Sequence, residues 1–267
     1  MIFEDSTQMP LRPGEHIGED GLLYCDICKT PRQVSLYLFG ELRTFRCQCL
    51  CQQTRMQEER EQLQRQEAYD RFARLQSVGM RDPSLRECTF AASRYNGPVM
   101  RYAKNYVDHF QSNSMGLLLW GPVGTGKTYL AACIANALMA QGVSVLMTNF
   151  GRILGALPGP ASGERTAFLD GLMRFPLLIL DDFGTERDTP YALEMTYSII
   201  DARYRTGKPM IVTTNLTPAQ METPGIEEKA RIYDRVLECC FPIQVQEAHV
   251  REEIRQRKYD RIRGKIT

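Results

Sequence analysis

The chain has 267 residues, enough for one good-sized domain and a smaller one. Its hydrophobic content of 43% is ordinary for a globular protein, and its net charge of +1 excludes a global attraction to nucleic acid or membrane. No apolar run approaches the roughly 18 residues of a membrane-spanning helix, and the polar start MIFEDSTQMPLRPGEH lacks the apolar centre of a secretion signal. We therefore expect a cytoplasmic protein with no membrane association.

Five of the nine cysteines fall within residues 25–51, with the spacing C-x2-C-x18-C-x-C-x-C. In a reducing compartment this pattern favours metal ligands over disulfides, and paired thiolates form the tetrahedral sulfur set that Zn²⁺ prefers. The runs VSLYLF and LRTFR predict a hairpin between the pairs, with its turn at Gly40 and Glu41. The competing interpretation is five unrelated thiols. The expected zinc ligands are Cys25, Cys28, Cys47 and Cys49, with Cys51 as an alternate.

Residues 52–76 contain no Pro or Gly and are rich in Gln, Glu and Arg. This composition predicts an exposed helix supported by i,i+4 ion pairs, either a spacer or partner-binding arm or a solvated connection. Gly and Pro in residues 78–85 indicate a boundary. The predicted domains are an N-terminal zinc-binding module at 1–51, a helical linker at 52–80 and a larger domain at 81–267.

The segment LLLWGPVGTGKTYLAACIANAL, residues 117–138, combines a buried strand, a glycine-rich loop and an Ala-rich helix. The loop reads G-x-x-x-x-G-K-T, a P-loop, whose backbone N–H groups suit the phosphates of ATP. Lys127 is expected to reach the β- and γ-phosphates, and Thr128 to offer its hydroxyl to Mg²⁺. The expected nucleotide-binding residues are Gly121, Pro122, Val123, Gly124, Thr125, Gly126, Lys127, Thr128 and Tyr129.

A strand at 143–149 and a Gly/Pro-rich loop at 155–165 lead to a second buried strand, LLIL at 177–180, which ends at Asp181 and Asp182. An aspartate at the end of such a strand is placed to hold Mg²⁺, so Asp181 joins Thr128 as an expected magnesium ligand. Asp182 can polarise the water that attacks ATP. The alternative interpretation is that both aspartates belong to a solvated loop.

A helix at 190–208 precedes a buried strand at 209–216 that carries Asn215 near its end. In a parallel sheet this amide would lie between the P-loop and Asp182, where it could orient the attacking water or sense the γ-phosphate. The alternation of strands and helices, including a helix at 98–110, predicts the α/β class with a parallel sheet.

The next helix, at 226–240, carries Arg231 and Arg235 at i and i+4, hence on one face. If that face meets a neighbouring subunit, one arginine can stabilise the transferring phosphate in trans. The alternative is that both arginines form surface ion pairs. A strand at 241–246 and a basic final helix are expected to follow.

Four ordered motifs, GPVGTGKT, LLILDDFGTE, DARYRTGKPMIVTTNL and ARIYDRVLE, together resemble the DnaC-type bacterial and phage helicase loaders. These are AAA+ ATPases, close to the loader DnaI and the transposition helper IstB. The resemblance covers residues 85–255. The N-terminal cysteines also resemble the zinc-binding N-domain of DnaI-like and prophage loaders.

The resemblance implies an ATPase with a P-loop AAA+ sheet, flanking helices and a reduced or absent lid. It also implies that Asn215 is sensor 1, Arg235 the arginine finger and Arg251 a sensor-2 candidate that contributes to nucleotide binding. Asp182 departs from the glutamate that is commoner at its position in AAA+ proteins.

In the resembled family the N-domain docks on the replicative helicase, and the ATPase domain assembles on it and contacts single-stranded DNA. The resemblance therefore implies a loader that uses ATP as a switch, with the helicase and single-stranded DNA as partners and a homo-oligomer as the assembled state. The alternative is a transposase-helper ATPase of the IstB kind, which coats duplex DNA. The separate zinc module favours the loader, and a small-molecule kinase is a more distant alternative.

Overall fold

The structure is a computed structural model that describes residues 11–93, 97–157, 162–185 and 188–246. The chain divides into two compact units, residues 1–69 and 70–267. The division falls inside one long helix, α1 (Leu50–Gly79). The final basic helix, Arg251 and the extent of any lid lie outside the described residues. No helix in the described part of the chain is long and apolar enough to cross a membrane.

The first unit contains two small antiparallel sheets, formed by β1 (Glu15–Ile17) with β2 (Leu23–Cys25) and by β3 (Gln33–Leu38) with β4 (Glu41–Arg46). The predicted hairpin is therefore present, but its turn lies one residue earlier, at Phe39 and Gly40. Both turn residues have positive φ, 54° and 87°. Two-residue hairpin turns of this kind match the twist of the flanking strands, which explains the shift.

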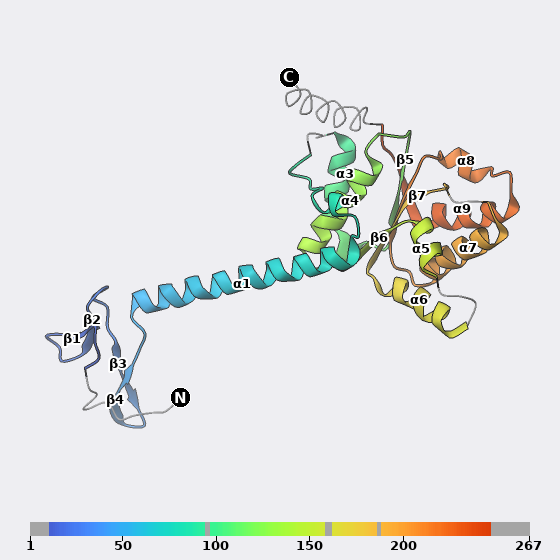
Figure 1. Ribbon diagram of the computed structural model, residues 1–267. Helices are drawn as coiled ribbons and strands as arrows, with labels where there is room; N and C mark the ends of the chain where they lie inside the picture. The colour runs from blue at the N-terminus through green and yellow to red at the C-terminus, as the bar shows by residue number, and fades with distance from the viewer. Residues whose placement is uncertain (1–10, 94–96, 158–161, 186–187, 247–267) are drawn as a thin grey trace, which may run out of the picture. The chain divides into compact units, whose positions relative to one another are not determined.

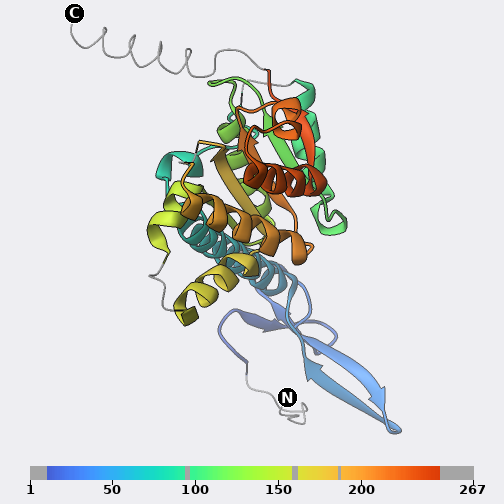
Figure 2. The same cartoon turned by 90° about the vertical axis from the view of Figure 1, so that its right-hand side faces the viewer.

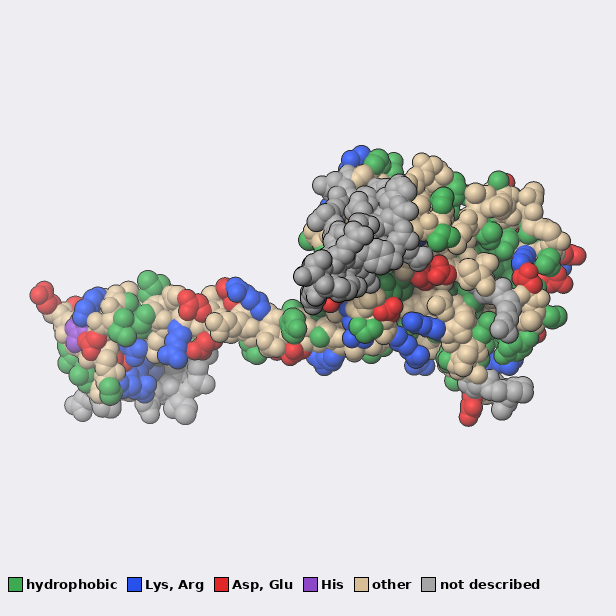
Figure 3. All heavy atoms as spheres, turned by 45° about the horizontal axis from the view of Figure 1, so that its top comes forward, with side chains coloured by type: hydrophobic (Ala, Val, Ile, Leu, Met, Phe, Trp, Pro, Cys, Tyr) green, Lys and Arg blue, Asp and Glu red, His purple; other side chains and the backbone are tan. Residues whose placement is uncertain are grey.

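The interior of the first unit is small. The Glu15 carboxylate is buried, and Arg32 and Arg46 donate to its Oε1 atom over 2.8 and 3.1 Å. Among the described residues of this unit, the buried hydrophobic side chains are Leu23, Cys25 and Cys49. Hydrophobic, basic and acidic side chains are interspersed on the surface shown in Figure 3. A unit of this size with so little core needs further cross-links to stay folded.

The second unit is built on a five-stranded parallel sheet in the order β6-β7-β8-β5-β9. The predicted α/β class is confirmed. Since β5 is flanked by β8 and β9, the loop after it lies at the same sheet edge as the ends of β7 and β8. The strands are β5 (Gly116–Trp120), β6 (Val145–Thr148), β7 (Leu177–Phe183), β8 (Met210–Thr214) and β9 (Cys240–Gln244).

Helices cover both faces of this sheet (Figure 1). Along β5 the side chains alternate, so that Leu117 and Leu119 pack with α3 and α4, whereas Leu118 packs with α5, α7 and α9. Figure 2 shows α7 in orange and α9 in red-orange lying side by side across the second face. The helices are α2 (Pro83–Arg86), α3 (Pro98–Asp108), α4 (Lys127–Ala140), α5 (Phe150–Ala156), α6 (Ser162–Arg174), α7 (Pro190–Arg205), α8 (Pro218–Glu222) and α9 (Glu227–Cys239).

The segment between β6 and β7 is more helical than the sequence predicts. Asn149 caps α5 by accepting from the Arg152 N–H over 2.9 Å, and α6 already begins at Ser162. The expected loop at 155–165 is therefore shorter, because both of its ends belong to helices.

Candidate functional site

The loop between β5 and α4 depends on glycine where the chain comes close to its neighbours. A Cβ atom on Gly121 would lie 2.4 Å from the Val245 carbonyl oxygen, which no real side chain tolerates. Gly126 has a φ of 92° and occupies the N-cap of α4. The glycines therefore allow the loop to pass β9 and turn directly into the helix, leaving the helix N-terminus open to an anion.

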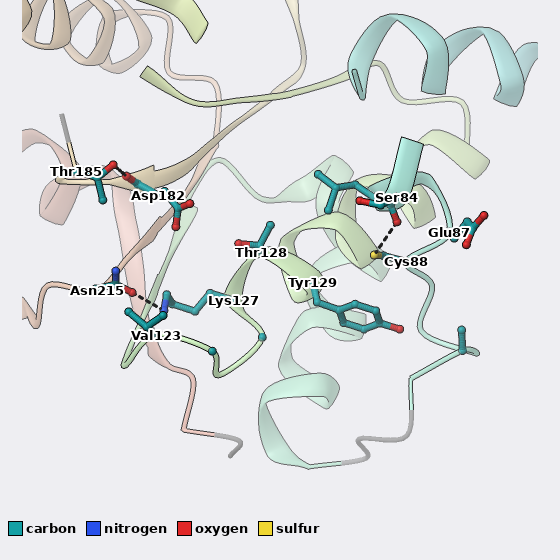
Figure 4. A pocket seen from close by; sticks show the side chains of 14 residues that line it. Ser84, Glu87, Cys88, Val123, Lys127, Thr128, Tyr129, Asp182, Thr185 and Asn215 are labelled. Carbon is teal, nitrogen blue, oxygen red and sulfur yellow. Dashed lines mark hydrogen bonds between the residues drawn. The ribbon is translucent and has the colours of Figure 1, made fainter. Parts of the chain in front are cut away.

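Lys127 is buried and folds back across this loop. Its Nζ atom donates to the carbonyls of Gly121 and Pro122 and to Asn215 Oδ1, each over 2.8 Å. Figure 4 shows the contact between Lys127 and Asn215. The structure thus brings the predicted phosphate-binding lysine together with the amide that follows β8.

Asp181 lies at the centre of a cluster of oxygen atoms. Its Oδ1 atom accepts from Thr128 Oγ1 over 3.0 Å and from Thr213 Oγ1 over 2.7 Å. Burial raises the pKa of the Asp181 carboxyl, and the hydrogen bonds from Thr213 and Thr128 offset part of that rise. A carboxylate beside hydroxyl oxygens has the donor chemistry that Mg²⁺ prefers. The sequence motifs predict Asp181 and Thr128 as partners but not Thr213, which lies on the neighbouring strand.

Asp182 occupies a β-bulge, where β7 has one more residue than β8 between the pairs Leu180–Val212 and Phe183–Thr214. Its φ of 55° is left-handed, a conformation that aspartate tolerates better than most residues. Its N–H donates to Thr213 Oγ1 over 2.9 Å. The bulge turns Asp182 away from Asp181, and its exposed side chain lines the pocket beside the P-loop.

Lys127, Thr128, Asp182 and Asn215 line a cavity of about 860 Å³. That volume is within the range of ordinary ligand pockets. Asp182, Thr185 and Asn215 lie at one end, and Ser84 and Cys88 at the other, with the P-loop helix between them (Figure 4). The second end is not predictable from the motifs, because Gly and Pro in residues 78–85 indicate only a domain boundary. The lining residues outside the P-loop and the two strand ends are Ser84, Leu85, Glu87, Cys88, Ala92 and Thr185.

Four cysteines of the first unit form a compact cluster. The Sγ atoms of Cys25, Cys28, Cys49 and Cys51 all lie within 4.8 Å of one another. A hydrogen bond with the Thr30 hydroxyl lowers the pKa of the Cys28 thiol to about 5, which favours the thiolate that binds metals. Four sulfur donors at this spacing have the chemistry of a structural zinc site.

Cys47, expected among the ligands, lies outside this cluster, and Cys51 belongs to it instead. The Cys47 N–H donates to the Arg32 carbonyl over 2.8 Å and so extends the pairing of β3 with β4. This pairing holds its Sγ atom 3.5 Å from the Pro31 carbonyl, away from the cluster. Cys51 reaches the cluster instead, because it lies in the first turn of α1, where the chain curls back toward Cys49.

A profile of the IstB-like ATP binding protein family matches residues 48–258. That match covers more than half of the chain. The chain belongs to the IstB-like ATP-binding protein family.

Individual relatives of this IstB-like protein agree with the assignment. It is 29% identical to YdaV of Escherichia coli K12 over 184 residues, which cover 66% of this chain and 72% of that protein. It is 30% identical to the replicative helicase loader DnaC of Escherichia coli K12 over 122 residues, covering 45% of this chain and 50% of that protein. The match thus spans half the length of DnaC. The crystal structure of DnaI, at 24% identity, has a TM-score of 0.55, covers 67% of this chain and all of that one (100%), and shows the same fold.

The two arginines of α9 differ in their surroundings in this IstB-like protein. Arg231 pairs with Glu227 over 3.2 Å and is largely exposed. The Arg235 guanidinium lies 4.3 Å from the centre of the Tyr204 ring and 3.2 Å from Glu238. Neither arginine lines the described cavity that holds Lys127. Arg235 thus contacts Tyr204 and Glu238, and its action on a phosphate stays a prediction.

Proposed function

We propose that this protein is an ATPase that uses ATP binding and hydrolysis as a switch to load a replicative helicase onto DNA. The observation that carries the proposal is the hydrogen bond between Lys127 and Asn215 at one edge of the sheet. It links the loop that would grip the phosphates to a strand end that would sense them. The similarity to the loader DnaC supports the same conclusion.

The residues of the pocket fit a nucleotide and a magnesium ion. When bound, ATP supplies the bond to be cleaved and Mg²⁺ neutralises its developing charge. Lys127 and the loop N–H groups would hold the phosphates, and Thr128 with Asp181 would hold the metal shell. Asp182 would polarise the attacking water, and Asn215 would orient it.

The cysteine cluster fits one structural zinc ion. Such an ion would supply the cross-link that the small core of the first unit lacks. We propose that the part of the first unit that contains this cluster, Cys25 to Cys51, is a separate module that docks on the helicase. This function places the protein in the cytoplasm, assembled as a homo-oligomer on the helicase and in contact with single-stranded DNA.

The test is reconstitution with the hexameric replicative helicase of the source cell. We expect the purified protein to co-elute with that helicase in size-exclusion chromatography. We also expect it to be required for unwinding of a fork covered with single-strand-binding protein. Lys127→Ala should still co-elute but fail to load, whereas Cys51→Ser should fail to co-elute.

The second candidate function is a transposase helper of the IstB kind, favoured by the family to which the chain belongs. It predicts that the protein forms ATP-dependent filaments on duplex DNA and ignores the helicase. Filaments on duplex DNA without any helicase complex would replace the loader proposal with this one.

A further inference from the structure

Asn136 is a buried amide in a helix that is otherwise apolar where it is buried. Apart from Lys127 at its start, the other buried residues of α4 are Ala, Leu, Ile, Met and Cys. Asn136 is only 2% exposed. Burying an amide without partners is unfavourable by a few kcal/mol, on the order of 2–7. Its presence therefore points to specific hydrogen bonds.

Asn136 holds the short segment that carries α2. Its Nδ2 atom donates to the Leu85 carbonyl over 2.8 Å and to the Cys88 carbonyl over 2.7 Å. Both N–H bonds of the amide are thus used on two backbone carbonyls three residues apart. The amide orientation follows, because the opposite one would set its oxygen against both carbonyls.

The remaining atom of the amide connects to α1. Gln76 Nε2 donates to Asn136 Oδ1 over 2.7 Å and to the Arg86 carbonyl over 3.1 Å. The Arg86 guanidinium in turn donates to the Met80 carbonyl, at the end of α1, over 3.0 and 2.8 Å. A Cβ on Gly79 would lie 1.9 Å from the Val145 carbonyl, so this end of α1 is also pressed against the edge strand β6.

The segment held by Asn136 forms one wall of the nucleotide pocket. Leu85 and Cys88 line the cavity. Cys88 lies at the end away from Asp182 and Asn215, on the far side of the P-loop helix (Figure 4). Tyr129 extends this wall and donates its hydroxyl to the Thr89 carbonyl over 3.1 Å. Apolar and aromatic side chains suit a flat base, whereas the opposite end suits phosphates.

We propose that Asn136 and Gln76 are positioning residues for the nucleotide base. Asn136 fixes the wall that contains Leu85 and Cys88. Gln76, which binds Asn136, connects binding of the base at this end to the last turns of α1. This inference rests on the proposed binding of ATP in this pocket. It adds that α4 contributes twice, with Lys127 at the phosphates and Asn136 behind the base.

The test compares binding of ATP with binding of inorganic tripolyphosphate, which has the phosphates but no base. Asn136→Asp keeps the shape of the side chain but removes both donors to the wall. Because a buried hydrogen bond lost at one partner is worth on the order of a factor of ten, we expect ATP affinity to fall about tenfold. Tripolyphosphate affinity should stay within about twofold, since its contacts are confined to the P-loop end.

Gln76→Leu keeps the test valid if Asn136→Asp folds poorly, because Gln76 is only partly buried. It should lower the affinity for ATP while leaving the affinity for tripolyphosphate nearly unchanged. It should also abolish ATP-induced hydrogen-exchange protection at residues 72–80, which wild type should show. Ser77→Ala is the matched control, because Ser77 is exposed and, among the described residues, its hydroxyl donates only to the Arg74 carbonyl of the same helix.

The outcomes separate the two proposals. If wild type binds neither ATP nor tripolyphosphate, the proposed function itself fails. If both variants bind ATP with the affinity of wild type, the positioning role is overturned. It is also overturned if the variants lose affinity for ATP and for tripolyphosphate equally. Selective loss of ATP in the variants and not in Ser77→Ala supports it.

Discussion

The Nζ atom of Lys127 and the Oδ1 atom of Asn215 are 2.8 Å apart, which joins the P-loop to the residue after β8. A phosphate bound to this lysine would compete with the asparagine for the same ammonium protons. The position of the Asn215 side chain therefore depends on what Lys127 holds. Such an exchange of partners is a physical basis for sensing the nucleotide.

Substituting Lys127 and substituting Asn215 should affect ATP binding and hydrolysis differently. Lys127→Ala should abolish ATP binding, because the ammonium is the side-chain cation of the loop. Asn215→Ala should bind ATP with nearly normal affinity, yet hydrolyse it more slowly by about 10²-fold, as is typical for loss of one group that stabilises the reacting state. Isothermal calorimetry and a phosphate-release assay check this. Normal hydrolysis by Asn215→Ala would remove that residue from the reaction.

Asp181 should make the nucleotide-free protein less stable at neutral pH. Its folded-state pKa is raised by burial, so the folded state favours the neutral carboxyl. Well below the ordinary pKa of aspartate, both states hold the proton and there is no penalty. The penalty develops as the pH rises and is complete above the raised folded pKa.

Asp181→Asn should remove this penalty, because its amide oxygen can still accept from Thr128 and Thr213. In buffer with a chelator and no nucleotide, the variant should melt at a higher temperature than wild type at pH 7. The difference should shrink at acidic pH, and Mg²⁺-dependent hydrolysis should be lost. A variant that melts below wild type at pH 7 would contradict the argument.

The cysteine cluster makes a prediction that distinguishes two neighbouring thiols. Purified protein should contain one zinc per chain by elemental analysis. Cys51→Ser should lose the metal and unfold the first unit, whereas Cys47→Ser should retain it, because Cys47 belongs to the hairpin. Both variants should still bind ATP. Metal loss from Cys47→Ser with retention in Cys51→Ser would reverse the ligand assignment.

Arg235 should act on the neighbouring subunit. Arg235→Ala should keep ATP affinity nearly normal. It should lower the hydrolysis rate in the assembled state by about 10³-fold or more, the usual effect of losing an arginine finger. Arg231→Ala should have a weaker effect. Mixing Arg235→Ala with Lys127→Ala subunits should restore part of the turnover. Mixed assemblies that stay inactive would leave Arg235 as a partner of Tyr204 and Glu238 only.

The sheet was predictable because its strands are continuous aliphatic runs, such as Leu177–Leu180, that suit burial on both faces. The P-loop followed from its G-x-x-x-x-G-K-T spacing, and the strand-end aspartates followed from the aliphatic run before them. The turn at Phe39 was missed because a bulky aromatic residue with positive φ is uncommon, and local propensity favoured Gly40 and Glu41.

Two features of the sites needed three-dimensional information. The spacing C-x-C-x-C allows Cys47 or Cys51 to pair with Cys49, and only the hairpin register decides between them. The base end of the pocket comes from residues 84–92, whose composition resembles a linker. A polar residue in the buried run of α4, Asn136, was a signal in the sequence that could have revealed the contact.

The position of β9 has a consequence for synthesis of the chain. The Val245 N–H donates to the Trp120 carbonyl over 2.8 Å, and β9 pairs with β5 along its length. The strand that precedes the P-loop is thus paired with a strand that leaves the ribosome more than a hundred residues later. The cysteine cluster can close while translation is still in progress, but the loop has its full support only when residue 245 has emerged. In a nascent chain, the cysteine cluster would therefore fold during translation, and the nucleotide-binding loop would be fully supported only near its end.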